Sequence, residues 1–172
     1  MFYFIILCHL DTVMAVGSRH KHATSEGEHS KAELYSHSTL SWETQSSYPF
    51  HDGIRAFEIV ARSGHYILFG GIYPYQRADL STGFYSTDVI AKFNPSSNQW
   101  RKMGNLQNYR HGFGLIEIDK KFLVMGGQGN TPTEVCEVKN ELIECTPREP
   151  TMNDFYYNPE MMMVTSNYAN SC

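Results

Sequence analysis

Residues 93–100 read Phe-Asn-Pro-Ser-Ser-Asn-Gln-Trp, and residues 122–127 read Phe-Leu-Val-Met-Gly-Gly. Weaker copies of both segments occur upstream, where they end at Trp42 and at Gly70-Gly71. The two Gly-Gly pairs are 56 residues apart and the two tryptophans are 58 residues apart. A chain that repeats itself at a period near 50 residues is typical of folds that stack similar units. The spacing therefore predicts an architecture before any single residue predicts a chemistry.

The composition favours an all-β fold. Among the 172 residues are ten Phe, eleven Tyr, two Trp and thirteen Gly, which suit pleated strands and tight turns. The net charge is only −4 and no run of Lys or Arg occurs, so the charge pattern does not support nucleic-acid binding. No apolar stretch approaches the ~18 residues of a membrane-spanning helix, so we expect no transmembrane segment.

Each copy predicts two β-hairpins. Between Phe93 and Trp100 lies a turn-forming Asn-Pro-Ser-Ser-Asn segment, and Tyr35 precedes Trp42 by seven positions, as Phe93 precedes Trp100. The other hairpin of each copy, at 53–69 and 112–125, ends in the Gly-Gly pair. Glycines after a buried strand fit the close approach of a neighbouring backbone, where a Cβ atom would collide.

These motifs resemble the kelch repeat family. The family pattern has an aromatic residue, a Pro-containing turn, a Trp, an Arg-His-like pair and a hydrophobic run that ends in Gly-Gly. The second copy matches it with Phe93, Trp100, Arg110-His111 and Gly126-Gly127. The first copy carries Trp42 and Gly70-Gly71, but His51 stands where the Arg-His pair would fall.

The resemblance implies an all-β, kelch-like β-propeller, in which four-stranded antiparallel blades surround a central channel. It also implies that Arg110 braces loops and carbonyl groups inside the fold. We expect blade repeats around 31–71, 84–127 and 134–165, which makes a partial, open propeller of about two and a half blades. In the third repeat Cys145 takes the Trp position, and residues 155–157 and 161–164 supply the next strands.

The chain before the repeats divides into two segments. Residues 1–17 contain a short apolar run followed by small residues, which predicts a possible signal peptide or leader. The alternatives are a buried β-strand or a misplaced start site. Residues 18–30 are polar and rich in His, and we interpret them as a linker because their spacing matches no closed metal site. The propeller fragment then covers 31–168.

Cys136 and Cys145 are candidates for a disulfide. A hairpin that turns at Asn140-Glu141 would pair Cys136 with Cys145 at a non-hydrogen-bonded site, where Cα atoms are about 4.5 Å apart. The same register places Val138 and Ile143 on the face of the cysteines. The alternative is a pair of reduced thiols. Together with the possible leader, the disulfide favours a secreted protein, with a cytoplasmic protein as the alternative.

No motif predicts catalysis. The chain lacks a GxSxG nucleophile elbow, and its Gly126-Gly127 segment lacks the Lys and the helix of a phosphate-binding loop. We therefore expect no enzyme activity, no cofactor and no metal. Some kelch-type propellers are copper radical oxidases, but their Tyr, His and Cys set cannot be mapped onto this chain.

Binding through loops is the remaining prediction. The segments 72–83 and 128–133 would project from one end of the blades, and Tyr73, Tyr75, Arg77 and Tyr109 are residue types that dominate binding energy when exposed. The alternative is that Tyr73 and Tyr75 pack against a neighbouring blade.

The sequence thus predicts a non-catalytic, kelch-type module that binds a protein partner of unknown identity. Two other hypotheses are a fragment of a substrate adaptor of a ubiquitin ligase and a fragment of a galactose-oxidase-like propeller. An open set of blades leaves edge strands unpaired, so we also expect either self-association or a longer gene product.

Overall fold

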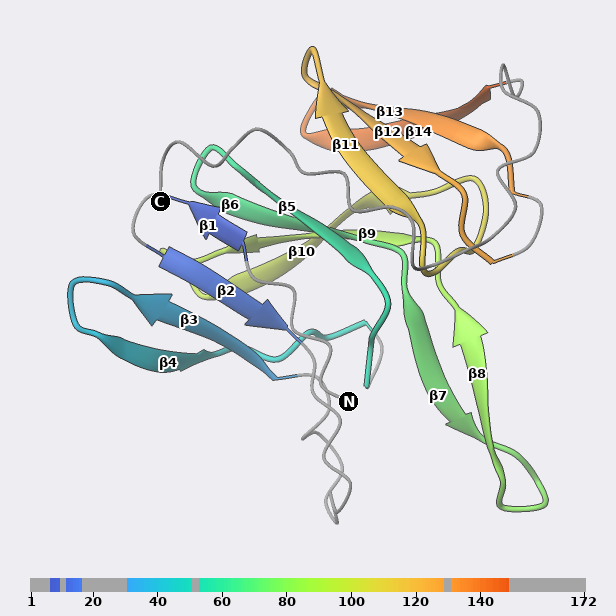
Figure 1. The fold of residues 1–172 in the computed structure, drawn as a ribbon, viewed down its shortest axis with the longest axis horizontal. Helices are drawn as coiled ribbons and strands as arrows, with labels where there is room; N and C mark the ends of the chain where they lie inside the picture. The colour runs from blue at the N-terminus through green and yellow to red at the C-terminus, as the bar shows by residue number, and fades with distance from the viewer. Residues whose placement is uncertain (1–6, 10–11, 17–30, 51–52, 129–130, 149–172) are drawn as a thin grey trace.

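Figure 1 shows a computed structural model, which describes residues 7–9, 12–16, 31–50, 53–128 and 131–148, with side chains from residue 13 onward. Within these ranges the chain forms β-strands and turns and contains no helix. None of the described segments is therefore a helix of the length and hydrophobicity that a membrane span requires. The predicted all-β fold is confirmed.

The first sheet has the strand order β1-β2-β3-β4, and each neighbouring pair is antiparallel. Its strands are β1 (Leu7–His9), β2 (Thr12–Val16), β3 (Ala32–Ser36) and β4 (Ser41–Gln45). Residues 13–16 of β2 are buried. Part of the predicted leader thus forms strands, in agreement with the alternative of a buried strand.

Two further four-stranded antiparallel groups follow. The second sheet consists of β5 (Glu58–Arg62), β6 (His65–Phe69), β9 (Val89–Asn94) and β10 (Gln99–Asn105). The third sheet consists of β11 (Gly114–Ile118), β12 (Lys121–Met125), β13 (Thr133–Lys139) and β14 (Leu142–Arg148). A short parallel pairing of β10 with β14 joins them into one eight-stranded sheet. The chain therefore forms kelch-like blades in an open arrangement.

The sheets group the hairpins differently from the predicted repeats. The second sheet begins with the hairpin that ends in Gly-Gly and finishes with the Phe93–Trp100 hairpin, whereas the repeats were expected to begin at the aromatic hairpin. The connection after β4 leads from the first sheet to the second. The backbone N–H of Ser46, in this connection, donates to Asn98 Oδ1 of the second sheet at 2.7 Å. A sequence period gives the length of the repeat but not the point at which a sheet begins.

The two tryptophan hairpins have the same local structure. Tyr35 pairs with Trp42 and Phe93 pairs with Trp100, each across a four-residue turn. The last turn residue is left-handed in both, with φ of 52° at Leu40 and 53° at Asn98. Asn tolerates this conformation better than Leu, which explains why the first copy is the weaker turn signal in the sequence.

Both Gly-Gly pairs adopt one backbone conformation, with φ of 54° and 115° at Gly70-Gly71 and 70° and 106° at Gly126-Gly127. A Cβ atom on Gly70 would lie 2.8 Å from the carbonyl oxygen of Arg110, and one on Gly127 would lie 3.1 Å from that of His111. The predicted close approach of a neighbouring backbone is confirmed. Glycine adopts the positive φ values without steric cost, whereas other residues would be strained there.

Two hydrophobic cores hold the sheets together. The core between the first and second sheets is built from aliphatic residues of both sheets and from aromatic residues around Trp100: Met14, Val16, Ala32, Leu34, Tyr48, Ile54, Phe57, Ile59, Tyr66, Leu68, Val89, Ala91 and Phe93. The core between the second and third sheets contains the disulfide: Ile67, Phe69, Ile90, Met103, Leu106, Phe113, Phe122, Val124, Cys136, Ile143 and Cys145.

The β13–β14 hairpin has the predicted register, with Cys136 opposite Cys145 and a Cα–Cα distance of 4.0 Å in a disulfide. Asn140 and Glu141 both have positive φ, as a two-residue hairpin turn requires. Val138 is the exception, because its side chain is exposed rather than buried with the cysteines. Cys136 pairs with Phe122 as Phe93 pairs with Tyr66, so Cys136 occupies the position of Phe93.

Several predictions fall outside the described residues. These are the linker at 18–30, the strands at 155–157 and 161–164, and His51. The linker and these strands stay predictions, as do the outer limits of the repeats.

Reduction of the Cys136–Cys145 bond should lower the free energy of unfolding by about 2–3 kcal/mol, because it removes a cross-link from the unfolded chain. Urea unfolding with and without dithiothreitol measures this difference. A double variant with both cysteines changed to Ala should show no effect of the reductant. Peptide mapping that finds both thiols free in the unreduced protein would contradict the assignment.

The stability should also depend on pH through Glu58, which lies opposite Phe69 beside the second core. Burial raises the pKa of this carboxyl to about 7. The folded protein then holds a proton that the unfolded chain releases above about pH 4.5, so this contribution is complete at low pH and is lost as the pH rises through 7. We expect a loss of about 1–2 kcal/mol, reduced from the full shift because the side chain keeps some solvent contact.

Urea unfolding at a series of pH values between about 5 and 8 tests this expectation. Glu58→Gln should flatten the profile by the stated amount. An identical pH slope in the variant and in the wild type would show that Glu58 is not the group responsible.

Candidate binding site

A β-hairpin projects from the body of the molecule between the second and third strands of the second sheet (Figure 1). It consists of β7 (Ile72–Gln76) and β8 (Thr82–Ser86), which pair only with each other among the named strands. The sequence predicted an irregular loop over 72–83, and this prediction is wrong. Alternating aromatic residues on both strands stabilise an extended ribbon that includes Pro74.

One face of this hairpin is a cluster of tyrosines. Tyr75 stacks on Tyr85 with ring centroids 4.0 Å apart, and Tyr73 lies 6.0 Å from the same ring. Gly83 is opposite Tyr75, and a Cβ atom at this glycine would collide with the Tyr75 ring. The aromatic ring thus covers a strand glycine, a device that stabilises exposed β-ribbons.

The other face carries Phe84, whose ring lies under the guanidinium of Arg55 at 4.1 Å from the centroid. Arg55 also exchanges two backbone hydrogen bonds with Ile72, at 2.8 and 2.9 Å. Nearby, Ser86 Oγ and His111 Nδ1 form a hydrogen bond of 2.8 Å. Burial, followed by the charge of Arg55, lowers the pKa of His111, so the imidazole is neutral near pH 7.

The tip of the hairpin presents a leucine in a strained conformation. Leu80 has φ of 67° and its side chain is 77% exposed. Asp79 accepts hydrogen bonds from the backbone N–H and the hydroxyl of Ser81, which closes the turn. Arg77 donates to the Tyr75 hydroxyl at 3.5 Å, and this bond lowers the pKa of Tyr75. The side chain of Leu80 therefore faces solvent and contributes nothing to the core.

The backbone of Arg110 anchors both ends of the hairpin. The Gly71 N–H donates to the Arg110 carbonyl at 2.9 Å, and the Arg110 N–H donates to the Thr87 carbonyl at 3.3 Å. The Thr87 N–H in turn donates to the Gly71 carbonyl at 2.9 Å. These three bonds hold the residues before β7 and after β8 together, so the hairpin leaves the body from a rigid base.

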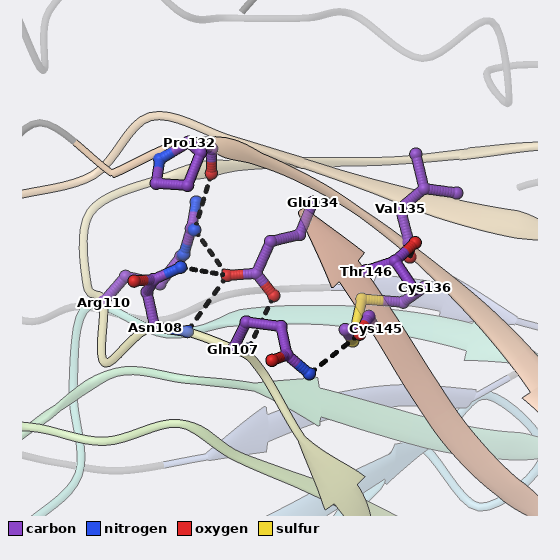
Figure 2. Close-up of a disulfide and its surroundings, with 9 residues drawn as sticks. All are labelled: Gln107, Asn108, Arg110, Pro132, Glu134, Val135, Cys136, Cys145 and Thr146. Carbon is purple, nitrogen blue, oxygen red and sulfur yellow. Dashed lines mark hydrogen bonds and ion pairs between the residues drawn. A yellow bond between two sulfur atoms is a disulfide. The ribbon is translucent and has the colours of Figure 1, made fainter. Parts of the chain in front are cut away.

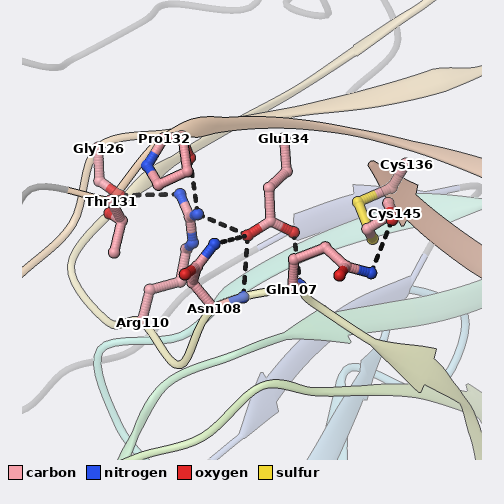
Figure 3. Close-up of polar contacts among 9 residues, drawn as sticks. All are labelled: Gln107, Asn108, Arg110, Gly126, Thr131, Pro132, Glu134, Cys136 and Cys145. Carbon is pink, nitrogen blue, oxygen red and sulfur yellow. Dashed lines mark hydrogen bonds and ion pairs between the residues drawn. A yellow bond between two sulfur atoms is a disulfide. The ribbon is translucent and has the colours of Figure 1, made fainter. Parts of the chain in front are cut away.

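The side chain of Arg110 reaches the third sheet instead (Figure 3). Its guanidinium donates to Glu134 Oε1 at 2.6 Å and to the carbonyl groups of Gly126 and Pro132 at 3.1 and 2.8 Å. Both charged side chains are completely buried. Burial lowers the pKa of Arg110, against the attraction of Glu134. The role implied for this arginine, bracing carbonyl groups inside the fold, agrees with these contacts.

Glu134 also accepts from the segment that follows β10. The backbone N–H groups of Gln107 and Asn108 donate to it at 2.7 and 3.1 Å, and the Asn108 side chain donates at 3.1 Å. Gln107 Nε2 reaches the carbonyl of Cys145 at 2.8 Å, beside the disulfide (Figure 2). A carboxylate with four donors around it is fully engaged.

This cluster is not an open metal site. Ligand atoms of Glu134, Cys136 and Cys145 lie within 4.8 Å of one another. The two sulfur atoms are bonded to each other and therefore offer no thiolate. The arrangement is one of structural polar contacts that position the hairpin and the third sheet.

The structure brings Tyr73, Tyr75 and Arg77 together on one hairpin, while Tyr109 lies exposed in the connection between β10 and β11. Tyr73 and Tyr75 pack within their own hairpin rather than against a neighbouring blade. The sequence analysis missed Arg55. Gly127 packs against Arg110 and the His111 carbonyl, and Gly71 packs in the same way against Ile54 and the Arg55 carbonyl. The position of the Arg-His pair is therefore occupied in the first copy by Ile54-Arg55, not by His51. Arg55 precedes His111 by 56 positions, which is also the spacing of the two Gly-Gly pairs, and this match could have revealed the equivalence.

Leu80, Phe84 and Tyr85 were missed as well. The signal that could have found them is the alternation of side chains on Thr82–Ser86, which predicts a strand paired with Ile72–Gln76.

Comparison with known proteins places these features in context. The chain is 33% identical to Kelch-like protein 11 of Mus musculus over 67 residues, which are 39% of this chain and 9% of that protein. It is 32% identical to Kelch-like protein 15 of Homo sapiens over 91 residues, 52% of this chain and 14% of that protein. The chain thus spans only a small part of these relatives. No family model matches the sequence.

The fold is similar to that in the solved structure of YjhT, a kelch-type propeller, with a TM-score of 0.61 and 13% sequence identity. The similarity covers 85% of this chain and 51% of YjhT. At this identity the likeness concerns the fold alone.

Arg110→Met should lower the free energy of unfolding by about 3–5 kcal/mol, because it leaves the Glu134 carboxylate buried without its cation. Arg110→Met combined with Glu134→Leu should cost less than the single change, since the unpaired charge is gone. Urea unfolding of the wild type, both single variants and the double variant gives the coupling energy. Losses that simply add would refute a specific interaction between the two side chains.

Proposed function

Because the chain is a kelch-repeat polypeptide with an open set of propeller blades, we propose that it is a protein-interaction module that binds its partner through the β7–β8 hairpin. The observation that carries the proposal is the exposed set at the end of this rigidly anchored hairpin: Leu80 and Tyr85 are 77% and 51% exposed, and Phe84 lies on the opposite face. Large apolar and aromatic side chains held outside the core mark interaction sites.

The residue types suit recognition of another protein. Tyrosine presents a large amphipathic surface at low entropic cost, and arginine pairs with carboxylates through a planar fork. The stacking of Tyr75 on Tyr85 and the position of Arg55 over Phe84 order these side chains before a partner arrives. Pre-ordered side chains lose less entropy on binding, which favours affinity.

The charges of the hairpin indicate the kind of partner. Arg77 is exposed near the tip, Arg55 lies over the opposite face, and the acidic Asp79 has its carboxylate engaged by Ser81. Together with Arg55, the hairpin has two cations against one carboxylate. The partner segment that fits best carries apolar side chains beside one or more carboxylates.

The non-catalytic character of the chain belongs to this proposal. The most ordered polar group of the described residues, Arg110 with Glu134, is buried and occupied by structural contacts rather than open to a substrate. The hypotheses of a ubiquitin-ligase adaptor and of an oxidase-like fragment stay predictions, as does a secreted location.

Leu80→Gly tests the binding role without loss of the fold. Glycine accepts positive φ, so the change should raise the free energy of unfolding by up to about 1 kcal/mol while it removes the apolar side chain from the tip. We expect proteins captured from a cell lysate by the wild type to be lost from Leu80→Gly and from Tyr85→Ser, as measured by quantitative mass spectrometry.

Leu40→Gly is the matched control. Leu40 is another exposed leucine with positive φ in a hairpin turn, but it belongs to the first sheet. This variant should retain the captured proteins. Equal capture by the wild type, Leu80→Gly and Tyr85→Ser would refute the hairpin as the binding element.

A further inference from the structure

The two interfaces between sheets are built from equivalent positions. Toward the first sheet, the second sheet presents Tyr66, Phe93 and Trp100, which lie in one cross-strand row. Toward the second sheet, the third sheet presents the corresponding row of Phe122, Cys136 and Cys145. Each sheet thus uses the same face to receive its predecessor and the opposite face to receive its successor.

The face of the third sheet that would receive a successor carries an apolar row next to the Lys121–Glu137 ion pair. Ile116, Leu123 and Val135 form one cross-strand row on it, and each is only partly buried. The position of Leu123 relative to Gly-Gly is that of Ile67 in the second sheet, and the position of Met125 is that of Phe69.

In the second sheet these positions are covered. Ile67 is 4% exposed and Phe69 is 0% exposed, because the third sheet packs on them. Met125, like Leu123, is only partly buried. The third sheet therefore has apolar residues at the positions that form an interface in the second sheet, but these residues are less buried.

The face of the first sheet that would receive a predecessor shows the complementary feature. Trp100 of the second sheet donates its indole N–H to the Ser46 carbonyl at 2.8 Å and packs edge-on against Tyr48, with centroids 5.2 Å apart. Trp42 has the equivalent position in the first sheet, yet it is 50% exposed. Among the described residues no acceptor is recorded for its indole N–H.

The share of the YjhT propeller that this chain matches indicates how many further blades a closed ring would need. The three sheets of this chain correspond to 51% of the YjhT propeller. Two copies would supply six sheets, which falls within the ~4 to 8 blades of closed propellers. A half-ring of three sheets has one exposed face on its first sheet and one on its third sheet. A second half-ring of the same kind would cover both faces and close the ring.

We infer that two copies of this chain associate to form one closed propeller. The third sheet of each copy, through Leu123 and its row, packs on the first sheet of the other copy, around Trp42. Two-fold symmetry makes the two contacts identical and leaves no sheet face uncovered. This inference rests on the fold and is independent of the binding role of the hairpin.

Sedimentation equilibrium of the full 172-residue chain tests it. We expect twice the monomer mass of 19.7 kDa. Leu123→Glu and Trp42→Ala should each raise the dimer dissociation constant by a factor of about 1,000, which corresponds to the loss of a hot spot of about 2 kcal/mol at each of the two identical contacts. Leu80→Glu, a similar change on the hairpin, should leave the mass unchanged. Circular dichroism checks that each variant is folded.

Mixing the two interface variants distinguishes this arrangement from other kinds of dimer. In a mixed pair, the intact Leu123 of the Trp42→Ala copy meets the intact Trp42 of the Leu123→Glu copy, so one of the two contacts is native. Native mass spectrometry should therefore detect the mixed dimer at concentrations where neither variant pairs with itself.

Three results would overturn the inference: a wild-type monomer at about 100 μM, an assembly larger than two copies, or no mixed dimer after mixing. The first result is also the one expected if further blades of a longer polypeptide, or residues 149–172, cover these faces. Loss of capture by Leu80→Glu in a chain that remains dimeric would show that binding and assembly are separate properties.

Discussion

Arg110 and Glu134 are withdrawn from water together, and a buried ion pair of this kind is tolerated only where further hydrogen bonds support both charges. Here the support comes from three separate parts of the chain. The carbonyl of Gly126 follows β12, that of Pro132 precedes β13, and the N–H of Gln107 follows β10. The pair therefore requires the second and third sheets to be in their final positions at the same time.

The same residue ties assembly of the sheets to presentation of the hairpin. The side chain of Arg110 contacts the third sheet, while its backbone bonds to Gly71 and Thr87 at the base of β7 and β8. Two-stranded ribbons are marginally stable in water by themselves. The β7–β8 hairpin is an ordered, projecting element because its base is part of the packed body and its tyrosines stack along its length.

The sequence analysis succeeded where the physical cause is local. The register of the Cys136–Cys145 hairpin follows from a two-residue turn, and the Tyr35–Trp42 and Phe93–Trp100 hairpins follow from the turn residues between their paired positions. The prediction of a loop over 72–83 failed because the stabilising contact of Tyr75 with Gly83 joins opposite strands. The sequence analysis also placed His51 at a position that Ile54-Arg55 occupy, since sequence similarity there is weak.

The sequence by itself determined the tryptophan hairpins, the hairpins that end in Gly-Gly and the repetition of a kelch-like blade, because spacing, turn residues and alternation act over neighbouring positions. It also indicated the disulfide and the structural part of Arg110. Only the tertiary structure decided how the hairpins combine into sheets, which carboxylate meets Arg110, and that Leu80, Phe84 and Tyr85 stand outside the core. These features depend on contacts between residues distant in the chain, and burial at such contacts is a property of the packed molecule rather than of any single segment.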